Sequence, residues 1–147
     1  MRVRDHERRG LDADQTVAQP GRLSRLAELV LLYIATVINE RQTDRVDDFI
    51  APGYRGHGFH ADREALRSFL TWQAETAPEW VIDVQDVVAE RDRVAVRAVA
   101  SGTRAERAPG EPYDTPSFQR VEWITIYRIE SDLISEAWVV SRTLDVP

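Results

Sequence analysis

Apolar residues recur at every third or fourth position early in the chain, which is the period of an α-helix. The positions that follow this spacing are Leu23, Leu26, Val30, Tyr33 and Val37. They predict one long helix over residues 22–41. Its middle is apolar nearly all round, which indicates that the helix is covered on more than one side.

Two more helical segments are predicted before residue 80. A short one over residues 45–50 can be capped by Thr43 or Asp44 and is closed by Pro52. A longer one begins at the N-cap Asp62 and ends at Pro78. One face of this longer helix consists of Leu66, Phe69, Leu70 and Gln73. Between the two segments we expect a Gly-rich loop that carries Tyr54, His57, Phe59 and His60.

The hydrophobic period changes to two at Trp80, which is typical of β-strands. Four strands are predicted over residues 80–88, 94–101, 118–129 and 133–142, with a Pro-containing loop over residues 105–117. On the third strand Val121, Trp123, Thr125 and Tyr127 share one face. Three helices followed by four strands joined mostly by short turns indicate an α+β fold with an antiparallel sheet. One face of such a sheet packs on the helices.

Composition narrows the classes of function. The chain has 147 residues and a net charge of -6, which argues against nucleic-acid binding. It has no cysteine, so thiolate nucleophiles and disulfides are excluded. All 19 basic residues are arginine, so a lysine Schiff base is excluded as well. We expect one domain over residues 22–147.

Residues 1–21 are charged and lack an apolar stretch of signal-peptide length, so we expect a flexible N-terminal segment. The densest apolar run, residues 26–38, is too short to cross a bilayer. These features predict a protein without a membrane partner, and a cytoplasmic location by default.

Three stretches resemble the SnoaL-like polyketide cyclases, within the nuclear-transport-factor-like superfamily. The first is YIATVINERQTDRVDDFIAPGYRGH, residues 33–57, in which Tyr33, Asn39, Asp47, Tyr54 and His57 match the family's opening pattern. The second is VQDVVAERDRVAVRAVASGT, residues 84–103, similar to the family's central hairpin with its Arg97. The third is ITIYRIESDLISEAWVV, residues 124–140, which resembles the closing hairpin with Glu136 two residues before Trp138.

The resemblance implies a cone-shaped α+β barrel, in which three N-terminal helices pack on a curved, mostly antiparallel sheet around an apolar pocket. It also implies a homodimer and a cofactor-independent aldol-type ring closure of a polyketide-like substrate. In that chemistry a carboxylate removes a proton next to a carbonyl, and nearby donors hold the enolate oxygen. The chain departs from the pattern after Trp138. Where family members commonly carry an aspartate, it has Val139 and Arg142.

His57 and Glu136 are the candidate catalytic residues. His57 could act as acid, base or donor, or could only fix its loop. Glu136 shares a strand face with Trp138; inside the cone it could act as base. The structural alternative for Glu136 is a salt bridge with Arg97 or Arg142. No metal site is predicted, because His57 and His60 lack further ligands at a recognisable spacing.

A small apolar or aromatic substrate is the expected partner. Its pocket is predicted to be lined by Tyr33, Tyr54, Phe59, Arg97, Trp123, Thr125 and Trp138. Core packing is the alternative role for Tyr33 and Trp138, and an ion pair is the alternative for Arg97. Three functions stay open: an acid–base cyclase, a non-catalytic binding or accessory protein, and another reaction such as isomerisation, dehydration or pericyclic cyclisation. A carboxylate that projects into the cavity near His57 would favour the first of them.

Overall fold

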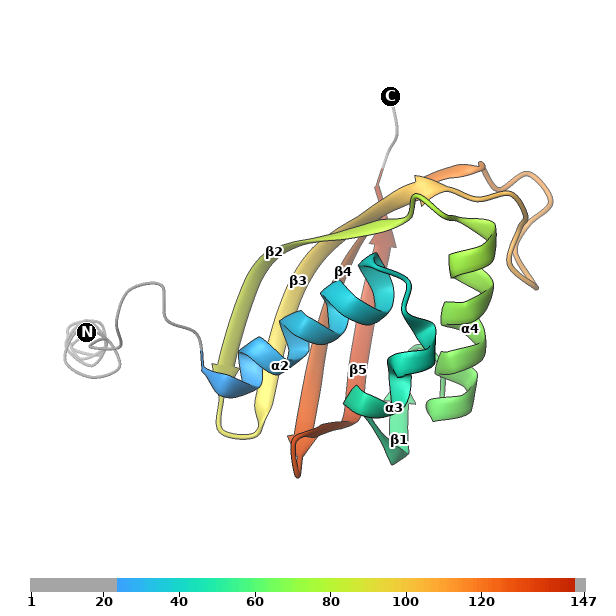
Figure 1. The fold of residues 1–147 in the computed structure, drawn as a ribbon. Coiled ribbons are helices and arrows are strands. Elements are labelled where there is room, and N and C mark those ends of the chain that lie inside the picture. The colour runs from blue at the N-terminus through green and yellow to red at the C-terminus, as the bar shows by residue number, and fades with distance from the viewer. Residues whose placement is uncertain (1–23, 145–147) are drawn as a thin grey trace, which may run out of the picture.

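The computed structural model describes residues 24–144, and its helices follow the pattern of the sequence (Figure 1). Helix α2 (Arg25–Tyr33) begins at Ser24, whose hydroxyl accepts a hydrogen bond from the Ala27 amide at 3.1 Å. The helix continues into η1 (Ile34–Asn39), a π-helical segment. The helix predicted over residues 22–41 is therefore present in the described part, but it ends at Asn39 and its last six residues have the wider turn.

The two shorter helical segments are also present, but neither Thr43 nor Asp44 caps the first of them. The segment predicted over residues 45–50 consists of a 3-10 turn, η2 (Thr43–Arg45), and one turn of helix, α3 (Val46–Phe49). Helix α4 (Arg63–Thr76) has Asp62 as its N-cap, since this carboxylate accepts a hydrogen bond from the Ala65 amide at 2.9 Å. None of the helices within residues 24–144 has the length and apolar character needed to cross a bilayer.

The segment predicted as a Gly-rich loop is mostly a strand, β1 (Ile50–His57), so that prediction was wrong. Pro52 and Gly53 were expected to interrupt regular structure. They instead lie on an edge strand, within the stretch between Ile50 and Arg55 where the register shifts. Proline is tolerated at such places because no ladder hydrogen bond from its nitrogen is needed.

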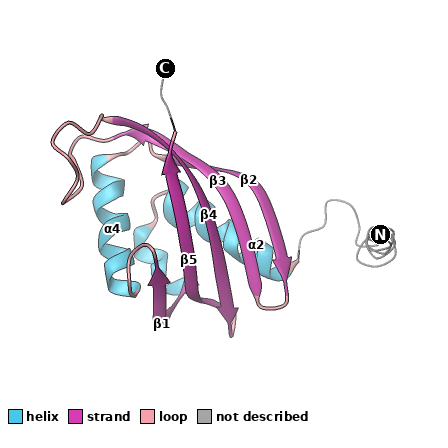
Figure 2. Ribbon diagram, turned by 180° about the vertical axis from the view of Figure 1, so that it is seen from behind, coloured by secondary structure: helices cyan, strands magenta, loops and turns pink. Residues whose placement is uncertain are grey.

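The sheet has five strands rather than four, in the order β1-β5-β4-β3-β2. The four predicted strands are β2 (Val81–Glu90), β3 (Arg93–Thr103), β4 (Phe118–Glu130) and β5 (Leu133–Thr143), and they pair with one another in antiparallel fashion. Only β1 pairs in parallel, along β5. The sheet is curved and open, and the helices lie on one of its faces (Figure 1), while Figure 2 shows the face that no helix covers.

The core lies between the helices and the covered face of the sheet. On β3 every second residue from Val94 to Ala100 is buried, as the period of two predicts. Side chains that are almost fully enclosed come from the helices and from three strands: Val30, Val37, Val46, Ile50, Val94 and Ile134. Asn39 fixes the end of η1 to β2, because its side-chain amide bonds to both the carbonyl and the amide of Ile82, at 2.9 and 2.8 Å.

Candidate functional site

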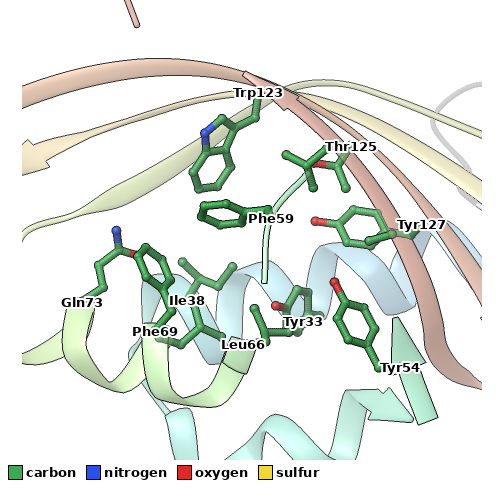
Figure 3. A pocket seen from close by; sticks show the side chains of 13 residues that line it. Tyr33, Ile38, Tyr54, Phe59, Leu66, Phe69, Gln73, Trp123, Thr125 and Tyr127 are labelled. Carbon is green, nitrogen blue, oxygen red and sulfur yellow. The ribbon is translucent and has the colours of Figure 1, made fainter. Parts of the chain in front are cut away.

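A cavity lies between the helices and the concave face of the sheet, and Figure 3 shows the side chains that line it. Its lining is almost entirely apolar or aromatic. The thirteen residues are Tyr33, Ile38, Tyr54, Phe59, Leu66, Phe69, Leu70, Gln73, Trp123, Thr125, Tyr127, Ala137 and Val139. They come from α2, η1, β1, α4, β4 and β5, and from the loop after β1. The cavity is therefore assembled by the whole domain, which is typical of a small-molecule site.

Three tyrosine side chains lie near one another at one end of the cavity. They belong to Tyr33 on α2, Tyr54 on β1 and Tyr127 on β4 (Figure 3). Burial raises the pKa of Tyr54 to about 12, and it raises the pKa of Tyr33 and of Tyr127 as well. The three phenols therefore keep their protons at neutral pH. They can donate hydrogen bonds to an acceptor oxygen in the cavity.

Phe59 closes the cavity from the side of the β1–α4 loop. Its ring lies 5.3 Å from the Phe69 ring and 6.1 Å from the Trp123 ring, measured between centroids. The neighbouring His60 stacks on Phe69 at 4.2 Å, and burial lowers the pKa of His60 to about 4. The centre of a water-sized sphere can occupy about 50 Å³ of the cavity, which is room for only a few water molecules. A larger ligand needs Phe59 or its neighbours to move.

Five of the nine residues predicted for the site line this cavity: Tyr33, Tyr54, Phe59, Trp123 and Thr125. Tyr33 is also part of the core, and its contact with a substrate stays a prediction. Trp123 and Thr125 share the inner face of β4, together with Tyr127. The remaining four predicted residues, His57, Arg97, Glu136 and Trp138, do not line the cavity.

Glu136 and Trp138 do share a strand face, but it is the face turned away from the cavity. The reason is a bulge in β5. Ile134 lies opposite Ile129 while Glu136 lies opposite Arg128, so one extra residue, Ser135, shifts the alternation. Ala137 and Val139 point into the cavity in their place. Without the bulge, a strand that buries Ile134 would also turn Glu136 inward.

Glu136 is the centre of a charged cluster on that outer face, which we call the outer cluster. His57 Nε2 lies 2.7 Å from one carboxylate oxygen of Glu136, and Arg55 donates to the same oxygen at 3.1 Å. Arg128 reaches the other oxygen at 3.5 Å. The His57 ring stacks on Trp138, with the centroids 5.2 Å apart. Because Glu136 and Trp138 are on β5, the cluster binds the edge strand β1 to the sheet.

The expected ion pairs of Glu136 with Arg97 or Arg142 are not formed. Both arginines bind Glu122 instead, at 3.2 Å from Arg97 and 2.8 Å from Arg142. Arg97 also pairs with Asp86 at 2.7 Å. Arg97 is thus part of a surface ion-pair network on the outer face. An ion pair was the alternative role considered for it from the sequence. Within residues 24–144, no three acidic or histidine side chains come together as a metal ion would require.

We expect Glu136→Gln to destabilise the fold at neutral pH, and the difference from wild type to shrink in acid. The hydrogen bond to His57, followed by that to Arg55, holds the pKa of Glu136 below its usual 4.5. The unfolded chain therefore takes up this proton at a higher pH than the folded chain does. The stabilisation is fully present above about pH 4.5 and is lost as the pH falls through the lower, folded pKa.

Urea unfolding of both proteins at about pH 7 and about pH 4 tests this expectation. The comparison is needed because Asp47, Glu111 and Glu122 also have lowered pKa values and make the whole fold acid-sensitive. Glu79→Gln is a suitable control, since Glu79 is exposed and forms no ion pair within the described residues. A Glu136→Gln deficit that is the same at both pH values would contradict the ion-pair role.

Eight lining residues were not predicted as part of a site. Leu66, Phe69, Leu70 and Gln73 had been recognised as one face of a helix, but that pattern does not distinguish a cavity wall from core. Tyr127 lies on the same strand face as Trp123, so the alternation along this strand could have identified it as a lining residue. The bulge hid Ala137 and Val139, and Ile38 reaches the cavity only because η1 has a π-helical turn.

The comparisons with known proteins identify the family. The family model of the SnoaL-like polyketide cyclases matches residues 28–146, so the chain belongs to this family. A SnoaL-like polyketide cyclase from Agrobacterium tumefaciens has a similar structure, with a TM-score of 0.68 and 18% identity over 82% of this chain and 93% of that one.

Two further structures share the fold. IdmH from Streptomyces antibioticus, a candidate polyketide cyclase, has a TM-score of 0.66 and 22% identity over 80% of this chain and 92% of its own. AclR from Streptomyces galilaeus, a candidate hydroxylase, has a TM-score of 0.66 and 17% identity over 82% and 91%. A search of the curated proteins found no match. The cone-shaped α+β fold expected from the resemblance is confirmed, with the sheet open rather than closed into a barrel.

Proposed function

We propose that this chain is a cyclase that closes a ring in a polyketide-like small molecule bound in the cone cavity. The observation that carries the proposal is the convergence of three protonated phenols at one end of an otherwise apolar cavity. Donors held in a dry pocket stabilise negative charge that develops on a carbonyl oxygen. The aromatic rings of Phe59, Phe69 and Trp123 offer flat surfaces for a planar substrate.

The lining residues include no carboxylate and no imidazole, so the base that an aldol closure needs is best supplied by the substrate. A 1,3-dicarbonyl unit exists partly as its own enol. The enol carbon forms the new bond to the ketone carbon, and the π pair of that ketone moves to its oxygen. This oxygen takes a proton from one of the three tyrosine phenols, which we call the tyrosine trio. The enol hydroxyl returns a proton to the trio as its own carbonyl forms. No net proton enters or leaves, and no cofactor takes part.

A second candidate is a binding or accessory protein with the same cavity. It is favoured by the same lack of a carboxylate or an imidazole among the lining residues, since His57 and Glu136 lie on the outer face of the sheet. Both candidates require a flat, apolar, carbonyl-bearing ligand. They differ in whether that ligand is changed.

Incubation with a panel of aromatic β-polyketone esters separates the two candidates. Calorimetry measures binding, and chromatography with mass detection measures conversion to an isomer, or to a product that has lost one water. We expect binding and conversion by the wild type, and conversion also by His57→Ala and Glu136→Gln. Binding without conversion would establish the second candidate. If both variants stay folded but no longer convert the ligand, His57 and Glu136 would be the catalytic residues after all.

We also infer that two copies associate through the face of the sheet that no helix covers (Figure 2). Large apolar side chains are exposed on it, among them Val88, Ile124, Ile126 and Val140. Ile124 lies opposite Val140 and Ile126 opposite Trp138 on adjacent strands, so they form a continuous outer apolar patch. Patches of this kind usually mark an interface. The arginines and acids around it, such as Arg97 and Glu122, would supply a polar rim.

Sedimentation measurements test this association. We expect the wild type to sediment as a dimer and Ile126→Glu to sediment as a monomer, because the new carboxylate would lose its water in the interface. Leu32→Glu provides the control, since Leu32 is 55% exposed but lies on the opposite side of the sheet, on α2. A monomeric wild type, or an Ile126→Glu protein that stays dimeric, would contradict the inference.

A further inference from the structure

Gln73 carries a buried amide beside the ligand cavity. It lies on α4, is only 6% exposed and lines the ligand cavity. Its side chain forms no hydrogen bond with any other residue between 24 and 144. Burying an unpaired amide is costly, and such groups in native proteins are usually satisfied by water or by a ligand. In Figure 3 Gln73 lies at the far side of the cavity from Tyr54 and Tyr127, with Phe59 between them.

A second, much smaller cavity lies on the other side of Gln73, between η1, α4 and Trp80. The space open to the centre of a water molecule in it is about 10 Å³, so this cavity can hold a single water. Arg41 and Trp80 line it together with Gln73. Arg41 Nε and Trp80 Nε1 are both enclosed and have no hydrogen-bond partner among the described residues. Three residues with polar side-chain groups thus line a space of the size that one water needs.

The arginine of this small cavity is held in place by its other two nitrogens. One donates to the Asn39 carbonyl at 2.7 Å and the other to the Trp80 carbonyl at 3.1 Å. Arg41 forms no ion pair with any of the acids in the described range. Its Nε–H and the indole N–H of Trp80 are donors only. Whatever occupies the small cavity must therefore accept from both.

We propose that a water in the small cavity orients Gln73 as a hydrogen-bond donor that selects the substrate. The water accepts from Arg41 Nε and Trp80 Nε1, and donates to the side-chain oxygen of Gln73. The NH₂ group of Gln73 then points into the ligand cavity. With the tyrosine trio at the other end, the cavity selects a flat molecule that carries an acceptor oxygen at each end. This assignment rests on the proposed function, because it concerns the ligand of the same cavity.

Two probes of the same shape test this selection: 2,6-diacetylnaphthalene, and 2-acetyl-6-isopropylnaphthalene, which lacks the second oxygen. We expect calorimetry to show that the wild type binds the diketone about tenfold more tightly, the effect of one hydrogen bond to a buried donor. Gln73→Leu should bind both probes equally. Gln73→Met, which keeps the length of the side chain, should do the same and serves if the leucine variant is unstable.

The water bridge is tested by removing one of its donors. Trp80→Phe deletes the indole N–H, and we expect the preference for the diketone to fall at least threefold as Gln73 loses its fixed orientation. Trp72→Phe is the matched control, because the Trp72 N–H bonds to Glu106 at 3.3 Å, away from the small cavity. It should keep the full preference. The ratio of two affinities within one variant does not depend on how much of the protein is folded.

The possible outcomes are distinct for the two proposals. Equal binding of both probes by the wild type would overturn the role of Gln73 and leave the cavity as a ligand site. A preference that survives in Gln73→Leu or Gln73→Met would do the same. A preference lost in the Gln73 variants but unchanged in Trp80→Phe would overturn the water bridge. If neither probe binds the wild type, this inference and the proposed function fail together.

Discussion

Changing Tyr54 and Tyr127 together to phenylalanine is expected to lower the turnover of any converted substrate by roughly 10²- to 10³-fold. In the proposed reaction, the two hydroxyls hold the carbonyl oxygen of the substrate as it gains negative charge. Their loss removes hydrogen bonds that strengthen as this charge develops, so kcat should fall more than substrate affinity does. The rings stay in place, and the apolar surface that binds the ligand is unchanged.

Steady-state kinetics of this double variant, with binding measured separately, checks the expectation. Tyr113→Phe is the matched control, because Tyr113 is 88% exposed on the loop between β3 and β4 and should be without effect. Burial raises the pKa of Tyr54 to about 12, so the wild type should keep its phenol-dependent activity up to about pH 10. Turnover that is unchanged in the double variant would rule out the trio as the group that holds the oxygen.

Gly56→Ala is expected to cost about 3 kcal/mol of stability, or roughly 10 °C in Tm. A methyl group at this position would lie 2.1 Å from the His60 carbonyl oxygen and 2.6 Å from that of Phe59. Both neighbours are backbone atoms, so neither can turn aside. The turn after β1 would have to open, and with it the contact of the Gly56 amide with the Ala61 carbonyl at 3.0 Å.

The chain offers a control on the same strand. A methyl group on Gly53 would meet nothing within 4 Å, so Gly53→Ala should change the stability by no more than about 0.5 kcal/mol. Thermal unfolding of the two variants beside wild type measures the difference. Because Phe59 lies within this turn, we also expect Gly56→Ala to weaken ligand binding in whatever fraction stays folded. Equal stability of the two variants would contradict the close packing of the turn.

Much of the fold could be predicted from the pattern of the chain. The helix period around Val30, the N-cap Asp62 and the alternation along β3 each correspond to an element in the structure. The family resemblance, made on three stretches of sequence, is confirmed by the family model. These features succeed because each depends on local spacing, which the sequence shows directly.

The site could be predicted only in part, for reasons that are physical. The alternation along β4 correctly brought Trp123 and Thr125 to one face. On β5 a single extra residue, Ser135, reversed the directions of Glu136 and Trp138, and a bulge of this kind has no reliable sequence signal. The strand β1 was missed because its glycines and proline suggest a loop, while its pairing with β5 is a contact between residues about 80 positions apart.

Because η1 is π-helical, the number of residues in this segment decides which side chains form one wall of the cavity. In a regular α-helix, residues five apart point in clearly different directions, but here Tyr33 and Ile38 both line the cavity. The wider turn, in which the Glu40 amide bonds to the carbonyl of Ala35, accommodates one more residue than an α-helix would. A relative that lacks this residue would lose either the place of Ile38 in the cavity wall or the hydrogen bonds from Asn39 to β2. An insertion or deletion of one residue in this helix could therefore redirect substrate choice in the family while every other lining side chain stayed the same.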